Sequence, residues 1–158
     1  MMNKVRIGDE VPHFMLFSSS DQEFSIKNYV GKKNIVLYFY PKDNTPGCIR
    51  EACAFRDSYE IFKKMGAEVI GISSDSQEKH QEFVKKYDLP FILLSDNENK
   101  VRKKFGVPST LGLIAGRVTY IIDKKGIVRH MFSSQFRPTK HIDEAKEVLK
   151  KLDNEQAT

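Results

Sequence analysis

Long apolar runs separated by more polar segments dominate the pattern of this sequence. Residues 34–40 read Asn-Ile-Val-Leu-Tyr-Phe-Tyr, and residues 68–73 read Glu-Val-Ile-Gly-Ile-Ser. Neither run alternates between polar and apolar positions, which is typical of strands that are buried on both faces in the middle of a sheet. A shorter apolar run at 91–94 is predicted to form a third strand.

The more polar segments carry apolar residues at helical spacing. The pattern predicts helices over residues 45 to about 65, 76 to about 87, 97–105 and about 139–152. The last of these has its apolar face at Ile142, Ala145, Val148, Leu149 and Leu152.

Two hairpins are predicted, one near each end of the chain. In the first, residues 12–17 and 23–26 flank a polar turn. In the second, residues 117–123 and 127–132 are joined by Lys-Lys-Gly. Together the elements predict an α/β fold with a mixed central sheet flanked by helices and an N-terminal hairpin extension. Such sheets place sites beyond the carboxyl ends of central strands, where residues 40–53 are expected.

Composition and charge narrow the class of protein. The 158 residues, 40% of them hydrophobic, predict a single domain over residues 1–158. The net charge of +5 is spread among acidic residues, so nucleic acid is not an expected partner. The amino terminus has no apolar leader, and no apolar run approaches the ~18 residues of a membrane span. The sequence therefore predicts a cytoplasmic protein that does not bind membranes.

The two cysteines lie five positions apart, in the stretch Tyr-Pro-Lys-Asp-Asn-Thr-Pro-Gly-Cys-Ile-Arg-Glu-Ala-Cys that ends at Cys53. A reducing cytoplasm disfavours a permanent disulfide, which favours redox, catalytic or metal roles. Two inert core cysteines are the alternative. The Cys-x4-Cys spacing is at the edge of the common zinc spacings and no second Cys or His pair follows closely, so no metal is expected.

The residues before Cys48 predict a helix start. Thr45 is the expected N-cap, and Pro46 takes the first helical position. Cys48 then occupies the third position, where free backbone N–H groups and the helix dipole stabilise a thiolate. The Thr45 hydroxyl should point at the amide of that same position, close to the sulfur. On an ideal helix the Cα atoms of Cys48 and Cys53 are about 8.7 Å apart, beyond the reach of a disulfide, so bonding requires the helix to unwind.

The motif Pro41-x-x-x-Thr45-x-x-Cys48 matches the active-site motif of peroxiredoxins, and with Cys53 at its spacing the segment resembles the peroxiredoxin Q subgroup, also called bacterioferritin comigratory protein. The resemblance covers about residues 8–152. It implies a thioredoxin-like fold and a thiol-dependent peroxidase with no metal, haem or flavin. Cys48 corresponds to the cysteine that peroxide oxidises to sulfenic acid, and Cys53 to the cysteine that resolves it to an intramolecular disulfide.

The same resemblance assigns three supporting residues and the partners. Thr45 matches a hydroxyl that hydrogen-bonds peroxide and sulfur, and Pro41 matches a residue that shields the thiolate. Arg117 matches the arginine that supports the thiolate and polarises the peroxide. The implied substrates are hydrogen peroxide and alkyl hydroperoxides, and thioredoxin or a similar dithiol protein would reduce the disulfide. A monomer is expected.

Two functions from different classes fit these residues. The first is an atypical two-cysteine peroxiredoxin in antioxidant defence. The second is a redox-sensing or holdase-type interaction protein that uses the same disulfide as a switch. Outside the motif, Glu51 is predicted either to face solvent or to help order the segment. The histidines are predicted to be on the surface or to be hydrogen-bonded structural residues: His13, His80, His130 and His141.

Overall fold

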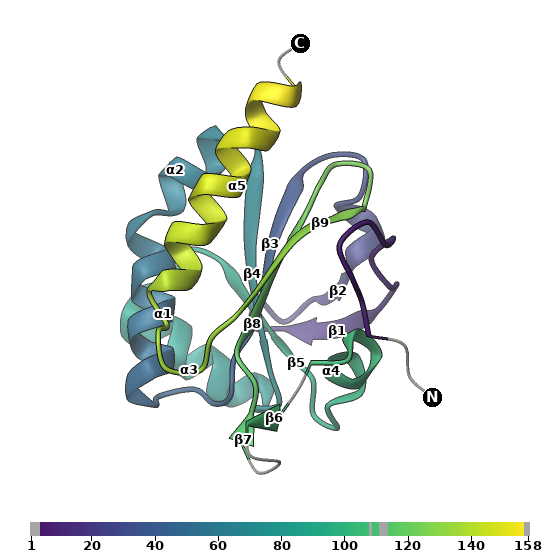
Figure 1. Ribbon diagram of the computed structural model, residues 1–158. Helices are drawn as coiled ribbons and strands as arrows, with labels where there is room; N and C mark the ends of the chain where they lie inside the picture. Colours follow the sequence, from purple (N-terminus) through teal and green to yellow (C-terminus); the bar gives the residue numbers. More distant parts are fainter. Residues whose placement is uncertain (1–3, 108, 111–113, 157–158) are drawn as a thin grey trace.

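The computed structural model describes residues 4–107, 109–110 and 114–156 (Figure 1). In these residues a seven-stranded sheet has the order β2-β1-β5-β4-β3-β8-β9. Its strands are β1 (Met15–Ser18), β2 (Glu23–Ser25), β3 (Asn34–Phe39), β4 (Ala67–Ser73), β5 (Ile92–Ser95), β8 (Val118–Ile122) and β9 (Val128–Ser133). A separate two-stranded sheet pairs β6 (Ser109–Thr110) with β7 (Ile114–Ala115).

The large sheet is mixed, as predicted. Strands β3, β4 and β5 run parallel, while β8 is antiparallel to β3. Both predicted hairpins are present, since β1 pairs with β2 and β8 pairs with β9 in antiparallel fashion. Strand β3 lies between β4 and β8, so its carboxyl end opens at an interior position of the sheet.

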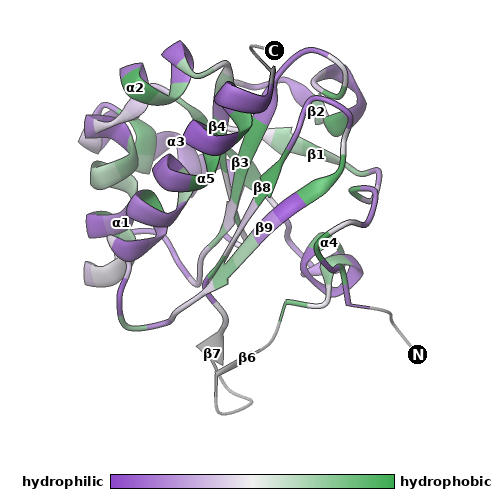
Figure 2. Ribbon diagram, turned by 45° about the horizontal axis from the view of Figure 1, so that its top comes forward, coloured by the Kyte–Doolittle hydropathy of each residue, from purple (hydrophilic) through white to green (hydrophobic). Residues whose placement is uncertain are grey.

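Helices cover one face of the sheet, and a smaller layer covers the other (Figure 1). The first face carries α1 (Pro46–Asp57), α2 (Tyr59–Lys64), α3 (Gln77–Tyr87) and α5 (Lys140–Gln156). The second face carries the N-terminal segment, a short 3-10 helix (Ile26–Asn28) and α4 (Lys100–Phe105). Figure 2 shows hydrophobic strands between helices with largely hydrophilic outer surfaces.

Strand β3 shows why the central apolar runs do not alternate. Val36 and Tyr38 pack into the cluster beneath α1 and α5, whereas Ile35, Leu37 and Phe39 pack into the cluster on the α4 side. All six residues of β3 are buried. Because both faces are covered, the positions from Ile35 to Phe39 all carry apolar or aromatic side chains, and only the first residue, Asn34, is polar.

The single helix predicted over residues 45 to about 65 is wrong, because the structure has two helices that meet at Ser58. This residue has φ −104° and ψ 3°, and its amide is shared between the carbonyls of Ala54 and Phe55. Such a shared bond is common at helix ends. Phe55 and Phe62, on either side of the break, pack with ring centroids 5.8 Å apart. Side-chain packing therefore connects α1 and α2 across the break in the backbone.

The helix predicted over residues 97–105 starts later, at Lys100. Asn99 adopts a left-handed conformation with φ 57°, which a continuing helix does not allow. The carboxylate of Asp96 accepts the amides of Val101 at 3.1 Å and Arg102 at 2.9 Å. These bonds satisfy amides that the first helical turn leaves free.

Candidate active site

Cys48 lies at the start of α1, directly beyond the carboxyl end of β3. Thr45 is the N-cap with an extended backbone, and Pro46 takes the first helical position. Cys48 is therefore third in the helix, as predicted. The backbone amide of Ile49 closes the first turn by donating to the Thr45 carbonyl at 2.8 Å.

The predicted cap by the Thr45 hydroxyl is not present. The Thr45 side chain makes no capping bond, and its hydroxyl instead donates to the Lys42 carbonyl at 2.8 Å. This bond closes the loop between β3 and α1 rather than covering the helix start. The amide of Cys48 is thus left without a side-chain acceptor from Thr45, which keeps an N–H group beside the sulfur.

Arg117 is the residue that brings the site together. It precedes β8, which pairs with β3, and its Nη2 donates to Cys48 Sγ at 3.4 Å. Its Nη1 donates to Glu51 Oε1 at 2.5 Å, and its Nε donates to the Gln135 carbonyl at 3.3 Å. Cys48, Glu51 and Arg117 are all buried, with exposed fractions of 1%, 0% and 4%. A buried guanidinium, held by its hydrogen bonds to Glu51 and Gln135, therefore faces the thiol of Cys48.

The charges in this group influence each other strongly. Burial raises the pKa of Glu51 to about 8, although the positive charge of Arg117 opposes that shift. Burial by itself would lower the pKa of Arg117, but Glu51 and Cys48 outweigh it, and the pKa is raised. The guanidinium consequently stays charged beside the sulfur.

His141 closes the group from the side of α5. Its Nδ1 lies 2.7 Å from the Thr119 hydroxyl, and its Nε2 lies 2.9 Å from the Ser134 carbonyl. Since a carbonyl only accepts, Nε2 carries a proton, and Nδ1 accepts from Thr119. Burial lowers the pKa of His141 to about 4, so the ring is neutral. Its Nδ1 lies 3.7 Å from Glu51 Oε2, an oxygen that makes no hydrogen bond among the described residues.

A cavity of about 310 Å³ adjoins this group at Arg117. Arg117 belongs to both the cavity wall and the Cys48 contact. Pro41 and Thr45, which the sequence predicts to lie near the sulfur, are also in the wall. The full lining is Pro41, Thr45, Gly47, Arg50, Arg117, Gln135, Phe136 and Pro138.

Cys53 lies apart from the cavity lining. Both cysteines are free thiols on the uninterrupted helix α1, and Cys53 is half-buried. An intact ideal helix separates residues five apart by about 8.7 Å between Cα atoms. The two cysteines are unbonded here, and the need for α1 to unwind before they bond stays a prediction.

A second polar group holds the loop before α1. His80 Nδ1 lies 2.6 Å from Asp43 Oδ2, and Asp75 Oδ2 accepts the Asp43 amide at 2.8 Å and the Ser73 hydroxyl at 2.7 Å. In the described residues, Asp43, Asp75 and His80 have the spacing of a metal-binding group, with ligand atoms within 4.8 Å of one another. These atoms already bond to protein groups, so their arrangement is that of a structural anchor.

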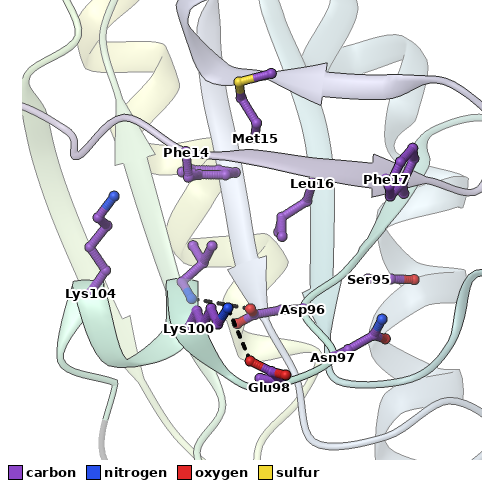
Figure 3. A pocket seen from close by; sticks show the side chains of 11 residues that line it. Phe14, Met15, Leu16, Phe17, Ser95, Asp96, Asn97, Glu98, Lys100 and Lys104 are labelled. Carbon is purple, nitrogen blue, oxygen red and sulfur yellow. Dashed lines mark hydrogen bonds and ion pairs between the residues drawn. The ribbon is translucent and has the colours of Figure 1, made fainter.

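Figure 3 shows a larger hollow, of about 460 Å³, between β1 and α4. Apolar side chains of Phe14 and Leu16 line one side, and Lys100 forms an ion pair with Glu98 at 3.0 Å on the other. Its lining shares no residue with the group around Cys48. The smaller cavity, in contrast, is lined by Arg117, whose side chain contacts Cys48 Sγ.

Comparison with known proteins identifies the family. Residues 7–131 match the AhpC/TSA family. Peroxiredoxin Q, chloroplastic, from Sedum lineare is 55% identical over 150 residues, which cover 94% of this chain and 80% of the relative. The protein of the same name from Arabidopsis thaliana is 55% identical, with coverage of 93% and 68%. This chain belongs to the peroxiredoxin family. Within it, the similarity is to peroxiredoxin Q, and the enzyme is a thiol peroxidase.

Solved structures agree with this assignment. Peroxidoxin BcpB from Mycobacterium tuberculosis is 34% identical with a TM-score of 0.85, covering 92% of this chain and 97% of that one. PrxQ from Xylella fastidiosa is 29% identical with a TM-score of 0.83, with coverage of 98% and 99%. The predicted thioredoxin-like fold is therefore confirmed for this peroxiredoxin.

The prediction of a cytoplasmic location is wrong. The relatives from Sedum lineare, Triticum aestivum, Populus jackii and Arabidopsis thaliana are all named as chloroplastic. The prediction rested on the amino-terminal sequence and on the absence of apolar runs, and neither observation identifies a compartment. Within the described part of the chain, every helix is too short or too polar to cross a bilayer.

Two members of this group were missed or left open by sequence reasoning. Glu51, for which solvent exposure and a structural role were both considered, is buried against Arg117. His141, predicted to be a surface or structural residue, is a buried structural residue close to Glu51. The polar helix positions 51 and 141 could have been flagged because each falls next to an apolar stripe, Ala52 and Phe55 in α1 and Ile142 and Ala145 in α5.

Proposed function

We propose that this peroxiredoxin reduces hydrogen peroxide and alkyl hydroperoxides through a sulfenic acid on Cys48. The contact between Arg117 Nη2 and Cys48 Sγ carries the proposal, because it places a fixed positive charge beside the sulfur. That charge favours the thiolate and can also stabilise the negative oxygen that leaves when the peroxide bond breaks. The proposed site residues are Cys48, Cys53, Thr45, Arg117 and Pro41.

The first step balances as a two-electron transfer. The Cys48 thiolate attacks one peroxide oxygen, the O–O bond breaks, and the sulfur becomes a sulfenic acid. The other oxygen leaves as hydroxide or alkoxide and takes up a proton to give water or an alcohol. The peroxide is reduced and the thiolate is oxidised, with no bound cofactor involved.

The surroundings of Arg117 support both substrates. Hydrogen peroxide needs only the polar end of the cavity, at Arg117 and Thr45. An alkyl group can contact the apolar part of the same cavity wall, which is formed by Pro41, Phe136 and Pro138. A relative of solved structure, the bacterioferritin comigratory protein of Xanthomonas campestris, is named for alkyl peroxide reduction activity and is 28% identical with a TM-score of 0.80.

The second step that we propose is resolution by Cys53. Its thiol attacks the Cys48 sulfenic acid, a disulfide forms, and water leaves. Because the helix holds the two sulfurs apart, α1 must unwind locally first. A dithiol protein such as thioredoxin then exchanges with the disulfide, becomes oxidised itself and returns both cysteines to thiols. Because both cysteines lie on the same helix of one chain, the proposed disulfide can form within a monomer.

Replacing Cys48 tests the first step. In an assay that couples peroxide loss to thioredoxin oxidation, Cys48→Ser should reduce turnover to the uncatalysed level, because an alcohol is not an effective nucleophile toward peroxide. Cys53→Ser is the matched control and should keep the single oxidation of Cys48 when the reduced protein meets one equivalent of peroxide. Full turnover by Cys48→Ser would contradict the proposal.

A thiol count tests the second step. After one equivalent of hydrogen peroxide, the wild-type protein should lose two thiols, and mass spectrometry should find a bond between Cys48 and Cys53. Cys53→Ser should lose one thiol and should no longer cycle with thioredoxin. A redox switch without enzyme function would instead show a Cys48 no faster than free cysteine, with partner binding that depends on oxidation.

A further inference from the structure

Arg102 on α4 reaches through the end of the sheet to the backbone of the site. Its side chain is buried, with 6% exposed, and comes from the layer opposite α1. Its Nη1 donates to the Gly116 carbonyl at 2.7 Å, and its Nη2 donates to the Tyr40 carbonyl at 2.9 Å. Both acceptors are backbone groups, so the guanidinium fixes the main chain and not another side chain.

These two carbonyls belong to the backbone segments that lead directly into the site. The Tyr40 carbonyl forms the peptide bond to Pro41, where the loop leading to Cys48 begins. The Gly116 carbonyl forms the peptide bond to Arg117, whose side chain contacts Cys48 Sγ. One rigid guanidinium therefore joins the two backbone segments that carry the opposite halves of the site.

We propose that Arg102 is a positioning residue for peroxide reduction, because it holds the peptide before Pro41 and the peptide before Arg117 at a fixed separation. The proposal rests on the proposed roles of Cys48 and Arg117. Arg102 touches neither the sulfur nor the cavity lining, and acts through Arg117. Displacement of Arg117 by a fraction of an ångström changes how well its charge meets the peroxide oxygens in the transition state.

Arg102 is itself held firmly. The Asp96 carboxylate accepts its backbone amide at 2.9 Å, and its guanidinium carbon lies 5.6 Å from the centre of the Phe39 ring. Burial lowers its pKa, while the charges of Asp96, Tyr120 and Cys48 act in the opposite direction. The planar guanidinium holds the two carbonyls with two nitrogens at a fixed separation, whereas a lysine would have to donate to both from one nitrogen on a flexible stem.

The test is Arg102→Lys, which keeps the charge and removes the fork. The second-order rate constant of the reduced protein with hydrogen peroxide should fall about 10- to 100-fold, the scale expected for a misplaced catalytic group. Alkylation of Cys48 by iodoacetamide at saturating pH should change by less than about twofold, because that reaction does not need Arg117 to contact an oxidant. An unchanged peroxide rate would overturn the proposal.

A double-mutant cycle separates positioning from general structure. If Arg102 acts through Arg117, then Arg102→Lys should cause little further loss in an Arg117→Gln background. Equal losses in both backgrounds would overturn the proposal. Val128→Ala serves as the control for stability, because Val128 is buried at the far end of the β8–β9 hairpin. This variant should be less stable yet keep the peroxide rate, and a loss equal to that of Arg102→Lys would also overturn the proposal.

The same experiment distinguishes two kinds of failure. If Cys48→Ser keeps the peroxide rate, the proposed function is wrong. If Cys48→Ser and Arg117→Gln lose the rate while Arg102→Lys keeps it, only the positioning role is wrong. Arg102→Met, which leaves both carbonyls without a donor, should lose at least as much as Arg102→Lys, and the lysine variant decides the question if the methionine variant does not fold.

Discussion

At the scale of single residues, Gly47 is where the site has the least room. A Cβ atom at this position would lie 2.9 Å from Arg117 Nη2, the nitrogen that donates to Cys48 Sγ. The backbone of Gly47 has no unusual conformation, so space and not flexibility explains the glycine. Its missing side chain lets the guanidinium lie directly against the helix start.

Gly47→Ala should therefore slow peroxide reduction without weakening the fold. We expect the rate constant with hydrogen peroxide to fall about 10-fold or more as the guanidinium moves off the sulfur. The free energy of unfolding should change by no more than about 1 kcal/mol, because the preference of alanine for a helix offsets the cost of moving a guanidinium that also bonds to Glu51. Stopped-flow oxidation and denaturant titration measure the two quantities, and a variant that is both fast and stable would contradict this explanation.

The residues that could be predicted from sequence share a local signal. Thr45, Pro46 and Cys48 form a short helix start whose chemistry can be read position by position. The direction of the Thr45 hydroxyl could not be read, because the Lys42 carbonyl competes for it. Glu51 and His141 each fall next to an apolar stripe, which is a local signal for burial. Their partners across the fold, Arg117 and Thr119, could not be predicted because no local pattern reveals such contacts.

At the scale of elements, helix α1 carries both cysteines and, between them, a buried carboxyl group. Glu51 has its raised pKa of about 8 only while α1 is folded, because an open helix would release the side chain to water. Between its ordinary value of 4.5 and about 8, the folded helix holds a proton that the open helix loses. Rising pH thus favours the open helix across this range.

We expect the step from sulfenic acid to disulfide to become faster as pH rises from about 5 to about 8. The Cys53 thiol also becomes more reactive with rising pH, so the comparison with Glu51→Gln decides. Glutamine does not titrate, so the rate of disulfide formation in Glu51→Gln should depend less steeply on pH. The pH dependence that comes from the Cys53 thiol is the same in both proteins. Rapid mixing of pre-oxidised protein followed by acid quenching and thiol counting gives these rates. Identical pH profiles would contradict the role of Glu51.

At the scale of the whole molecule, α5 is tied to the sheet through a neutral histidine. His141 bonds to Thr119 on β8 and to the carbonyl of Ser134, which follows β9. Its pKa is lowered from 6.5 to about 4 by burial, so the unfolded chain binds a proton that the folded protein excludes. Its contribution to stability is present above pH 6.5 and is lost as pH falls toward 4 and below.

The free energy of unfolding should therefore fall by about 3 kcal/mol from this residue alone when the pH drops from 7 to below 4. Other carboxyl groups contribute over the same range, so His141→Gln is the reference. The glutamine variant should be less stable at neutral pH and should lose less stability on acidification. Urea titrations at a series of pH values measure the difference, and parallel curves for the two proteins would refute the assignment.

The layers of the molecule could be predicted, but the order of its strands could not. Alternating strands and helices require a covered sheet, and the unbroken burial of β3 follows from that arrangement. Strand β1 joins the sheet beside β5 through only two residue pairs, Phe17 with Ser95 and Ser18 with Leu94. A pairing of so few residues, between strands that are far apart in the chain, leaves no periodic pattern in the sequence.

The break at Ser58 limits how far a disturbance in α1 can spread. The amide of Phe62 bonds to the Ser58 carbonyl, so α2 has a hydrogen-bonded turn that does not depend on the carbonyls of α1. Unwinding around the cysteines can then end at Ser58 and leave Phe62 in the core. We therefore expect α1 to open as a cooperative unit, losing the contact of Phe55 with Phe62 while α2 keeps its own hydrogen bonds. Amide hydrogen exchange should show this directly, with residues 46–57 exposed in the disulfide form and residues 59–64 still protected.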